Sequence, residues 1–290
     1  MNQYNPTRVT PPEERVDQLI DLSFAEDIGD GDHTTLCCIP PDAMGSSHLL
    51  IKEEGVLAGV EVAREVFRRF DPELKVEVFM PDGTHVRPSD IAMLVSGRTQ
   101  SLLQTERLML NIMQRMSGIA TTTARYVSLL EGTGTHVLDT RKTTPGMRIL
   151  EKEAVRIGGG MNHRIGLFDM ILLKDNHVDF AGGIDKAIGR AHDYLKAKGK
   201  NLKIEIEVRN FDELEQVLRI GGVDRIMLDN FSTADTREAV KRIGGRFETE
   251  SSGGITIDTL RDYAECGVDY ISVGALTHHV GNLDMSLKAY

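Results

Sequence analysis

Six short apolar runs in the second half of the chain constrain the fold most. The runs are rich in β-branched residues, and they span residues 135–140, 168–174, 203–208, 225–230, 247–252 and 269–274. Helical patterns separate them, and the later runs start about twenty residues apart, as in a repeated strand–helix unit. They alternate little between apolar and polar positions, which is typical of strands covered on both faces. We therefore predict a (β/α) barrel with fewer than eight clear strands. A doubly wound open sheet is the alternative.

Each predicted strand ends in polar side chains. In chain order these are Arg141 and Lys142, Lys174 and Asp175, Glu207 and Arg209, Asp229 and Asn230, Ser251 and Ser252, and Ser272. The carboxyl ends of parallel strands form one face of such a fold, and active sites lie on that face. One polar strand end shows only that the chain meets water, but six in succession predict a site.

Positive charge gathers after the first of these strands. The whole chain carries a net charge of −10, yet residues 139–177 hold seven Lys or Arg against five Asp or Glu, which gives +2 locally. The motif DTRKTTPGMR at 139–148 sets two cations side by side. An acidic protein with such a local surplus is expected to bind a small, highly charged anion. A broad basic face for a nucleic acid is not indicated.

The last two strands are followed by glycine-containing turns, SSGG at 251–254 and SVGA at 272–275. Glycine lets backbone N–H groups approach a phosphate, and the next helix N-terminus adds a favourable partial charge. Barrels often bind phosphate after their final two strands. We therefore predict a phosphate site at these turns.

Glu207 and Asp229 end adjacent predicted strands, so their carboxylates are expected to converge. Two hard oxygen ligands suit Mg²⁺, which proteins usually hold through one or two carboxylates and substrate phosphates. The same pair would also suit ribose hydroxyls or a cationic transition state. Salt bridges to Arg209 and Lys174 are the structural alternative, and Glu205 is the alternative to Glu207.

The first half of the chain has mixed patterns. Residues 12–26 and 60–70 read as helices, and residues 47–97 are otherwise rich in strand patterns, with a hairpin predicted around Glu54–Gly55. Residues 100–131 read as helix with a break at Ser117–Gly118. This stretch is apolar around most of its circumference, which is typical of a buried helix or a subunit interface.

Composition indicates a cytoplasmic protein. The chain is 40% hydrophobic and 27% charged, as globular proteins are. Its polar N-terminus lacks the apolar segment of a secretory signal, and no apolar run reaches bilayer-spanning length. Cys37, Cys38 and Cys266 form no CxxC pair and are expected to be reduced thiols.

Beyond these patterns, the chain resembles the quinolinate phosphoribosyltransferase family, also called nicotinate-nucleotide pyrophosphorylase (carboxylating). The resemblance spans most of the chain. It rests on EDIGDGDHTT (26–35), DTRKTTPGMR (139–148), EKEAVRIGGGMNHR (151–164), ILLKDNH (171–177), IEIEV (204–208), IMLDN (226–230), ESSGGI (250–255) and ISVGALTH (271–278), which stand in the family's order. One departure is His279, where a small residue such as serine is expected.

The resemblance implies an activity and an architecture. Quinolinate and phosphoribosyl pyrophosphate would give nicotinate mononucleotide, pyrophosphate and CO₂ with Mg²⁺, in de novo NAD biosynthesis. The fold class would be α/β, with an N-terminal open-faced α/β sandwich at residues 1–116 and a partial (β/α) barrel at 117–276. The tail at 277–290 would pack back on the sandwich. A homodimer is implied, in which Arg107 enters the partner's site.

The family's functional positions also transfer to this sequence. Lys142, Glu207 and Asp229 are the implied catalytic residues, and Glu207 and Asp229 are also the implied metal ligands. The implied substrate-binding residues are Arg107, Arg141, Lys142, His163, Arg164, Lys174, Ser252, Gly253, Gly254, Ser272, Val273 and Gly274. His177 and Asn176 are expected to support the site rather than touch the substrate.

Three other functions remain open from the residues alone. A related enzyme, such as a nicotinate phosphoribosyltransferase or a molybdenum-locus pyrophosphorylase-like relative, would need fewer cations for a substrate without the second carboxylate. A Schiff-base aldolase would use Lys174 or Lys142 as its nucleophile. A noncatalytic anion-binding protein would have no use for Glu207 and Asp229 unless a metal intervened.

Overall fold

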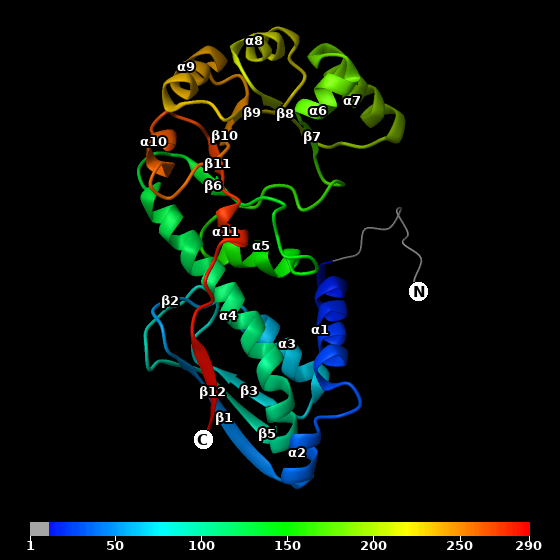
Figure 1. The fold of residues 1–290 in the computed structure, drawn as a ribbon, viewed down its shortest axis with the longest axis vertical. Coiled ribbons are helices and arrows are strands. Elements are labelled where there is room, and N and C mark those ends of the chain that lie inside the picture. The colour runs from blue at the N-terminus through cyan, green and yellow to red at the C-terminus, as the bar shows by residue number, and fades with distance from the viewer. Residues whose placement is uncertain (1–11) are drawn as a thin grey trace. The chain divides into compact units, whose positions relative to one another are not determined.

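The structure is a computed structural model that describes residues 12–290, so part of the polar N-terminal segment lies outside the described residues. The chain forms two compact units (Figure 1). Of the described residues, the first unit comprises 12–122, Thr143–Gly158 and Val280–Tyr290. The second unit comprises Thr123–Lys142 and Gly159–His279. The sequence predicted a boundary between residues 116 and 117 and a return of the tail at 277–290 to the sandwich, and residues 280–290 do belong to the first unit. The first unit also draws in 143–158, because the helix of that segment packs against the first helix of the chain.

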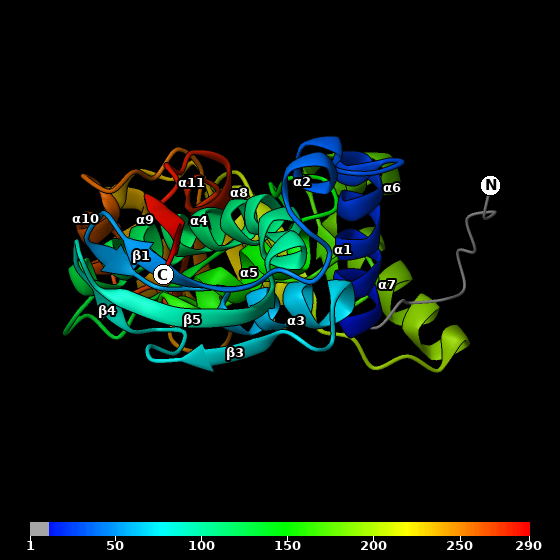
Figure 2. The ribbon, with the colours of Figure 1, turned by 90° about the horizontal axis from the view of Figure 1, so that it is seen from below.

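The first unit contains an antiparallel four-stranded sheet, in the order β12-β1-β5-β3. Its elements are α1 (Pro12–Ile28), α2 (His33–Cys38), β1 (Met44–Ile51), β2 (Gly55–Val56), α3 (Val60–Phe70), β3 (Lys75–Val78), β4 (His85–Val86), β5 (Ile91–Arg98), most of α4 (Thr99–Leu129), α5 (Arg148–Ile157) and β12 (Met285–Ala289). Helices α3 and α4 lie on the same face of the sheet (Figure 2). Leu49, Met93 and Val95 are fully buried, whereas the intervening Leu94 and Ser96 are partly exposed. This is the predicted open-faced sandwich.

Two local predictions for this unit are wrong. Strand β1 pairs with β12 and β5, and β2 pairs with β4, so no hairpin joins β1 to β2. Helix α4 is continuous through Ser117–Gly118. A Cβ atom on Gly118 would lie 2.1 Å from the carbonyl oxygen of Gly281. The glycine therefore permits a close backbone approach and does not end the helix.

The second unit is a six-stranded parallel sheet with helices along its outer side (Figure 1). Its elements are β6 (His136–Leu138), β7 (Ile171–Leu173), α6 (Asp175–Ala181), α7 (Ile184–Lys198), β8 (Ile204–Val208), α8 (Phe211–Ile220), β9 (Arg225–Asp229), α9 (Thr233–Ile243), β10 (Glu248–Ser252), α10 (Leu260–Ala264), β11 (Tyr270–Ser272) and α11 (Ala275–His278). All six predicted strands are present.

The strand order identifies this sheet as a partial barrel. The order β6-β11-β10-β9-β8-β7 follows the chain around a circle, with the first strand beside the last. Strands β6 and β7 are the two edges, so the barrel is open between them. The doubly wound alternative is wrong, because that fold reverses its strand order at a switch point. Within residues 12–290, no helix is both long and apolar enough to span a bilayer.

Asp71 joins several elements of the first unit. It follows α3, and its carboxylate accepts hydrogen bonds from Arg98 Nε at 2.8 Å, Ser101 Oγ at 2.7 Å and the Glu73 amide at 3.1 Å. The side chain is 1% exposed. Hydrogen bonding, above all from Arg98, lowers the pKa of Asp71 from 3.8 to about 2. This carboxylate therefore ties α3 to the end of β5 and the start of α4.

We expect Asp71→Asn to lower the free energy of unfolding by about 2 kcal/mol near neutral pH. The folded-state pKa lies below the unfolded-state value, so the carboxylate stabilises the fold above roughly pH 4 and loses that effect as pH falls toward 2. The difference between wild type and variant should therefore shrink over that range in urea unfolding. Asp21→Asn is the control, because the exposed Asp21–Arg69 ion pair should contribute less than about 1 kcal/mol. Equal losses in the two variants would contradict a special role for Asp71.

Candidate functional site

A pocket of about 350 Å³ opens at the carboxyl ends of the parallel strands, within the size range of small-molecule sites. It is lined by Thr140, Arg141, Lys142, His163, Arg164, Leu172, Lys174, Met227, Glu250, Ser252 and Ser272. Seven of these residues were predicted as substrate-binding from the sequence. The apolar lining, Leu172 and Met227, was not predicted, because nothing in the sequence separates it from other strand-interior residues. The pocket thus combines a cationic wall with an apolar surface on which a flat ring could rest.

The cationic wall comes from three separate segments. Arg141 and Lys142 follow β6, Arg164 lies in the loop after α5, and Lys174 follows β7. Burial lowers the pKa of Arg164, and the nearby positive charge of Arg141 lowers it further. Two guanidinium groups that repel each other in a partly buried site are stabilised when an anion binds between them. The wall is therefore suited to a carboxylate or dicarboxylate ligand.

The backbone on either side of Lys142 is held in place locally. Its amide donates a hydrogen bond to Thr140 Oγ1 at 3.0 Å, and its carbonyl accepts one from Thr277 Oγ1 at 2.9 Å. Thr277 belongs to α11, which follows the last barrel strand. The first and last strands are neighbours in the sheet. The Lys142 backbone is thus held by one residue that follows β6, Thr140, and by one that follows the neighbouring strand β11, Thr277.

Lys174 is positioned by the start of α6. Its amide donates to His177 Nδ1 at 3.0 Å. Its Nζ lies 3.6 Å from Glu207 Oε2, so the lysine faces the acidic side of the site. His177 caps the helix and supports Lys174, as the sequence predicted. Arg209 pairs instead with Asp179 and Glu213. Of the predicted salt bridges to Arg209 and Lys174, the structure therefore shows the one between Lys174 and Glu207.

Glu207 and Asp229 lie close enough for their charges to interact. Burial raises the pKa of Glu207, the Asp229 carboxylate raises it further, and Lys174 lowers it. Asn230 Nδ2 donates to Asp229 Oδ2 at 2.8 Å and fixes that carboxylate. Two interacting carboxylates beside a lysine suit a hard divalent cation such as Mg²⁺.

The turn after β10 is joined to Asn230. The Asn230 amide donates to the Ser252 carbonyl at 2.9 Å, and Asn230 itself has a left-handed φ of 55°. Gly253 has φ +102°, and a Cβ on it would lie 2.2 Å from Asn230 Oδ1. The Ser252–Gly254 turn therefore packs directly on the residue that holds Asp229. A phosphate bound at the turn would lie beside the acidic pair.

A buried charged cluster beneath the pocket was missed by the sequence analysis. Glu205, Arg225 and Glu250 lie on neighbouring strands, and Arg225 Nη1 is 3.0 Å from Glu250 Oε2. His163 Nε2 lies 3.0 Å from Glu205 Oε2 and 3.5 Å from Glu250 Oε2. Burial raises the pKa of both glutamates. One sequence pattern could have predicted this cluster: glutamates stand at alternate positions of IEIEV and ETESS, in strands expected to be covered on both faces.

The remaining predicted positions are more peripheral. Val273 directly follows β11 and is buried, and His279 is exposed at the end of α11. Arg107 lies on α4, in the first unit, with an exposed side chain. The structure thus gathers the predicted barrel residues at one end of the sheet and presents Arg107 on the surface of a helix.

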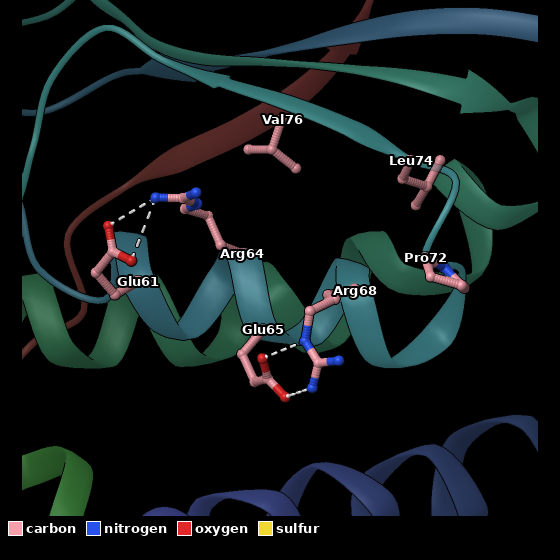
Figure 3. A pocket seen from close by; sticks show the side chains of 7 residues that line it. All are labelled: Glu61, Arg64, Glu65, Arg68, Pro72, Leu74 and Val76. Atoms are coloured by element: carbon pink, nitrogen blue, oxygen red, sulfur yellow. Dashed lines mark hydrogen bonds and ion pairs between the residues drawn. The ribbon is translucent and has the colours of Figure 1, made fainter.

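A second hollow lies in the first unit beside α3 and β3 (Figure 3). Its cations are already paired, Arg64 with Glu61 at 3.3 Å and Arg68 with Glu65 through a 2.7 Å hydrogen bond. These pairs leave no surplus positive charge for an anionic ligand. The barrel pocket is therefore the candidate site.

The comparisons with known proteins agree on one family. The model for "Quinolinate phosphoribosyl transferase, C-terminal domain" matches residues 119–288, and the N-terminal domain model matches residues 32–117. The chain belongs to the quinolinate phosphoribosyltransferase family. The resemblance predicted from the motifs is confirmed.

Individual relatives of the quinolinate phosphoribosyltransferase family align over nearly the whole chain. This chain is 43% identical over 285 residues to the chloroplastic nicotinate-nucleotide pyrophosphorylase [carboxylating] of Arabidopsis thaliana. The alignment covers 93% of this chain and 81% of the Arabidopsis protein. It is 38% identical over 270 residues to a probable nicotinate-nucleotide pyrophosphorylase [carboxylating] of Bacillus subtilis, covering 93% and 92%.

Solved structures share the fold of this chain. NadC from Streptococcus pyogenes superposes with a TM-score of 0.90 at 38% identity, over 97% of this chain and 98% of that one. Human nicotinic acid phosphoribosyltransferase superposes with a TM-score of 0.62 at 13% identity, over 97% and 74%, which shows a shared fold alone.

We expect Gly253→Ala to raise the KM for phosphoribosyl pyrophosphate by about tenfold or more, because the added methyl must displace Asn230 and strains a left-handed backbone. Steady-state kinetics with each substrate varied in turn would measure this. Gly132→Ala is the control. Gly132 also has positive φ, at +81°, but a Cβ there meets nothing within 4 Å. An unchanged KM in Gly253→Ala would remove this turn from the phosphate site.

Proposed function

We propose that this chain transfers the phosphoribosyl group of phosphoribosyl pyrophosphate to quinolinate and releases pyrophosphate and CO₂. The product is nicotinate mononucleotide, made in de novo NAD biosynthesis. The observation that carries this function is the arrangement of one pocket. Its cationic wall suits a dicarboxylate, and two lining residues connect it to groups that suit a ribose phosphate: Lys174 contacts Glu207 of the acidic pair, and Ser252 begins the glycine turn. Family membership supplies the reaction class.

Quinolinate would bind against the cationic wall. Arg141 and Arg164 would contact its carboxylates, since a guanidinium matches a carboxylate with two parallel hydrogen bonds. Lys142 and Lys174 would add point charges, and Leu172 and Met227 would contact the pyridine ring. This geometry would aim the ring nitrogen toward the ribose of the second substrate.

The transfer step needs a leaving pyrophosphate and a developing positive charge at ribose C1. Lys142 would neutralise the departing pyrophosphate, and the Glu207 and Asp229 carboxylates would face the ribose side of the oxocarbenium-like state. The ring nitrogen then attacks C1, and the C1–O bond to pyrophosphate breaks with its electron pair on oxygen. The protein needs no covalent nucleophile, because its groups position the substrates and balance charge.

Decarboxylation follows from the charge on the new pyridinium. The bond from ring carbon 2 to its carboxylate breaks, its electron pair stays on carbon 2 beside the cationic nitrogen, and a proton replaces the lost CO₂. Arg164, which is partly buried, would hold the remaining carboxylate in place through this step. The proposal therefore assigns substrate binding to the cationic wall and charge stabilisation to the acidic pair.

We propose Mg²⁺ as the metal of this site, with Glu207 and Asp229 as its protein ligands. Support comes from the two oxygen-donor carboxylates, whose mutual repulsion a divalent cation would relieve. When bound with the substrate, Mg²⁺ would neutralise pyrophosphate charge. The aldolase alternative is disfavoured because Lys174 faces Glu207, and an ion-paired ammonium is not the neutral amine that a Schiff base requires.

We further propose a homodimer in which Arg107 reaches the partner's site. The exposed Arg107 lies on α4 with the exposed Leu103 and Asn111, one turn apart on each side. Such a stripe, apolar and cationic, fits a subunit interface next to an anionic substrate. We also propose a cytoplasmic location, in keeping with Cys37 and Cys38, which are exposed as unbridged thiols.

We expect the purified protein to release CO₂ and nicotinate mononucleotide from quinolinate and phosphoribosyl pyrophosphate in the presence of Mg²⁺. Chromatography and trapping of labelled CO₂ would measure both products. Nicotinate in place of quinolinate is the matched comparison, because it lacks the carboxylate at ring position 2. Product from nicotinate alone would overturn the proposed substrate and favour the related transferase.

We expect Arg107→Ala and Lys142→Ala to be nearly inactive alone and to regain activity when mixed. Subunit exchange between the two variants would create hybrid dimers in which one site carries both substitutions and the other carries neither. Random pairing predicts about a quarter of wild-type activity, because half of the dimers are hybrids with one intact site each. Activity should be followed after mixing under conditions that allow exchange. Failure to regain activity, although hybrids form, would place Arg107 outside the partner's site.

A further inference from the structure

His163 touches protein groups through both of its ring nitrogens. Its Nδ1 accepts a hydrogen bond from the Arg164 amide at 2.7 Å. Its Nε2 faces the buried pair Glu205 and Glu250, at 3.0 and 3.5 Å. The His163 amide donates to Asp139 Oδ1 at 2.9 Å, at the end of β6. The backbone and the Nδ1 side of the ring are thus hydrogen-bonded, and the Nε2 side lies against two buried carboxyl groups.

The contact at Nδ1 decides the protonation form of the ring. A nitrogen that accepts an N–H hydrogen bond carries no proton, so the single proton of the neutral ring must be on Nε2. Protonation of Nδ1 as well would set two N–H groups against each other at 2.7 Å. Nε2 lies beside the two carboxyl groups, 3.0 Å from Glu205 Oε2 and 3.5 Å from Glu250 Oε2, without an aligned hydrogen bond to either in this structure.

The positive charge of this cluster is supplied by Arg225. Its Nη1 lies 3.0 Å from Glu250 Oε2, and its Nη2 lies 3.1 Å from Glu248 Oε2. The Arg225 guanidinium also lies 4.0 Å from the centre of the Tyr270 ring. The carboxyl groups therefore have a cationic partner that is independent of His163.

We propose that His163 works as a neutral positioning residue, whose Nε2–H lies next to Glu205 and Glu250 and whose Nδ1 fixes the Arg164 backbone, rather than contributing positive charge to the pocket. This inference rests on the proposed binding of a dicarboxylate by the cationic wall. The side chain that benefits is Arg164, whose guanidinium must meet the substrate carboxylate in a defined orientation. Glu205 and Glu250 act through His163 and are positioning residues as well.

A divalent metal is the competing occupant of this cluster. One nitrogen of His163 and one oxygen each from Glu205 and Glu250 all lie within 4.8 Å of one another. His163 Nε2, both Glu205 carboxylate oxygens and Glu250 Oε1 are buried without hydrogen bonds. A metal would bind Nε2 in place of its proton, however, and the neutral ring would then need its proton on Nδ1, where the Arg164 amide already donates. The geometry favours the proton.

The first experiment is nitrogen NMR on wild-type protein labelled with ¹⁵N-histidine, near neutral pH and without added metal. The neutral Nε2–H form gives two well-separated ring resonances, whereas an imidazolium gives two similar ones. His163→Gln would assign the resonances among the nine histidines by their disappearance. Imidazolium resonances for His163, or one bound divalent metal per chain that Glu205→Gln removes, would overturn the proposal. This measurement does not depend on activity, so it is separate from any failure of the proposed reaction.

The second experiment compares Glu205→Gln with Glu205→Leu. Glutamine keeps an oxygen acceptor for Nε2–H, whereas leucine removes the acceptor at similar size. We expect Glu205→Leu to raise the KM for quinolinate by about tenfold, with a smaller effect on kcat and on the KM for phosphoribosyl pyrophosphate. Glu205→Gln should recover most of the loss, because the role needs an acceptor and no negative charge.

The matched control is Glu248→Leu. Glu248 also binds Arg225 from a neighbouring strand, but its second partner is Lys203, whereas the carboxylates beside His163 are Glu205 and Glu250. We expect its KM for quinolinate to stay within about twofold of wild type. Equal defects in Glu205→Gln and Glu205→Leu would show that negative charge is required, and equal defects in Glu205→Leu and Glu248→Leu would show a general scaffold. Either result would overturn the proposal.

Discussion

Charged side chains inside the partial barrel must find partners, and this requirement organises the catalytic end of the molecule. Barrel interiors are usually filled by branched apolar residues. Here Glu205, Arg225 and Glu250 occupy inward positions on adjacent strands, and the register places Glu205 directly opposite Arg225. A buried charge without a partner costs several kcal/mol. The strands must therefore keep this register for the charges to be paired.

The site above the cluster depends on the same alignment. Glu207 and Asp229 lie two and four residues further along strands β8 and β9 than the paired Glu205 and Arg225, so they face inward as well. Ser252 pairs with Asp229 in the ladder of β10 and β9. A slip of one residue would turn these side chains to the helical side. The buried ion pairs and the proposed metal ligands are thus specified by one register.

Local hydrogen bonds then aim the cations. His177 fixes Lys174, Thr140 and Thr277 fix Lys142, and His163 fixes Arg164. Three of these supports lie within three residues of the cation that they hold, whereas Thr277 reaches Lys142 from the helix after the last barrel strand. Preorganisation of this kind lets charged groups act on a substrate without a further ordering cost.

The sequence by itself determined the parallel strands, their polar carboxyl ends and the family. Short β-branched runs at a regular spacing leave few alternatives, and motifs such as DTRKTTPGMR are read directly from the order of the residues. Only the tertiary structure decided how Gly118 is used, because the carbonyl of Gly281 approaches it from a distant part of the chain. Only the tertiary structure also showed the cluster around Glu205. The alternating charges of IEIEV are visible in the sequence, but their partners lie on other strands and in the loop after α5. Long-range pairing of this kind depends on strand order and register, which no local pattern in the sequence contains.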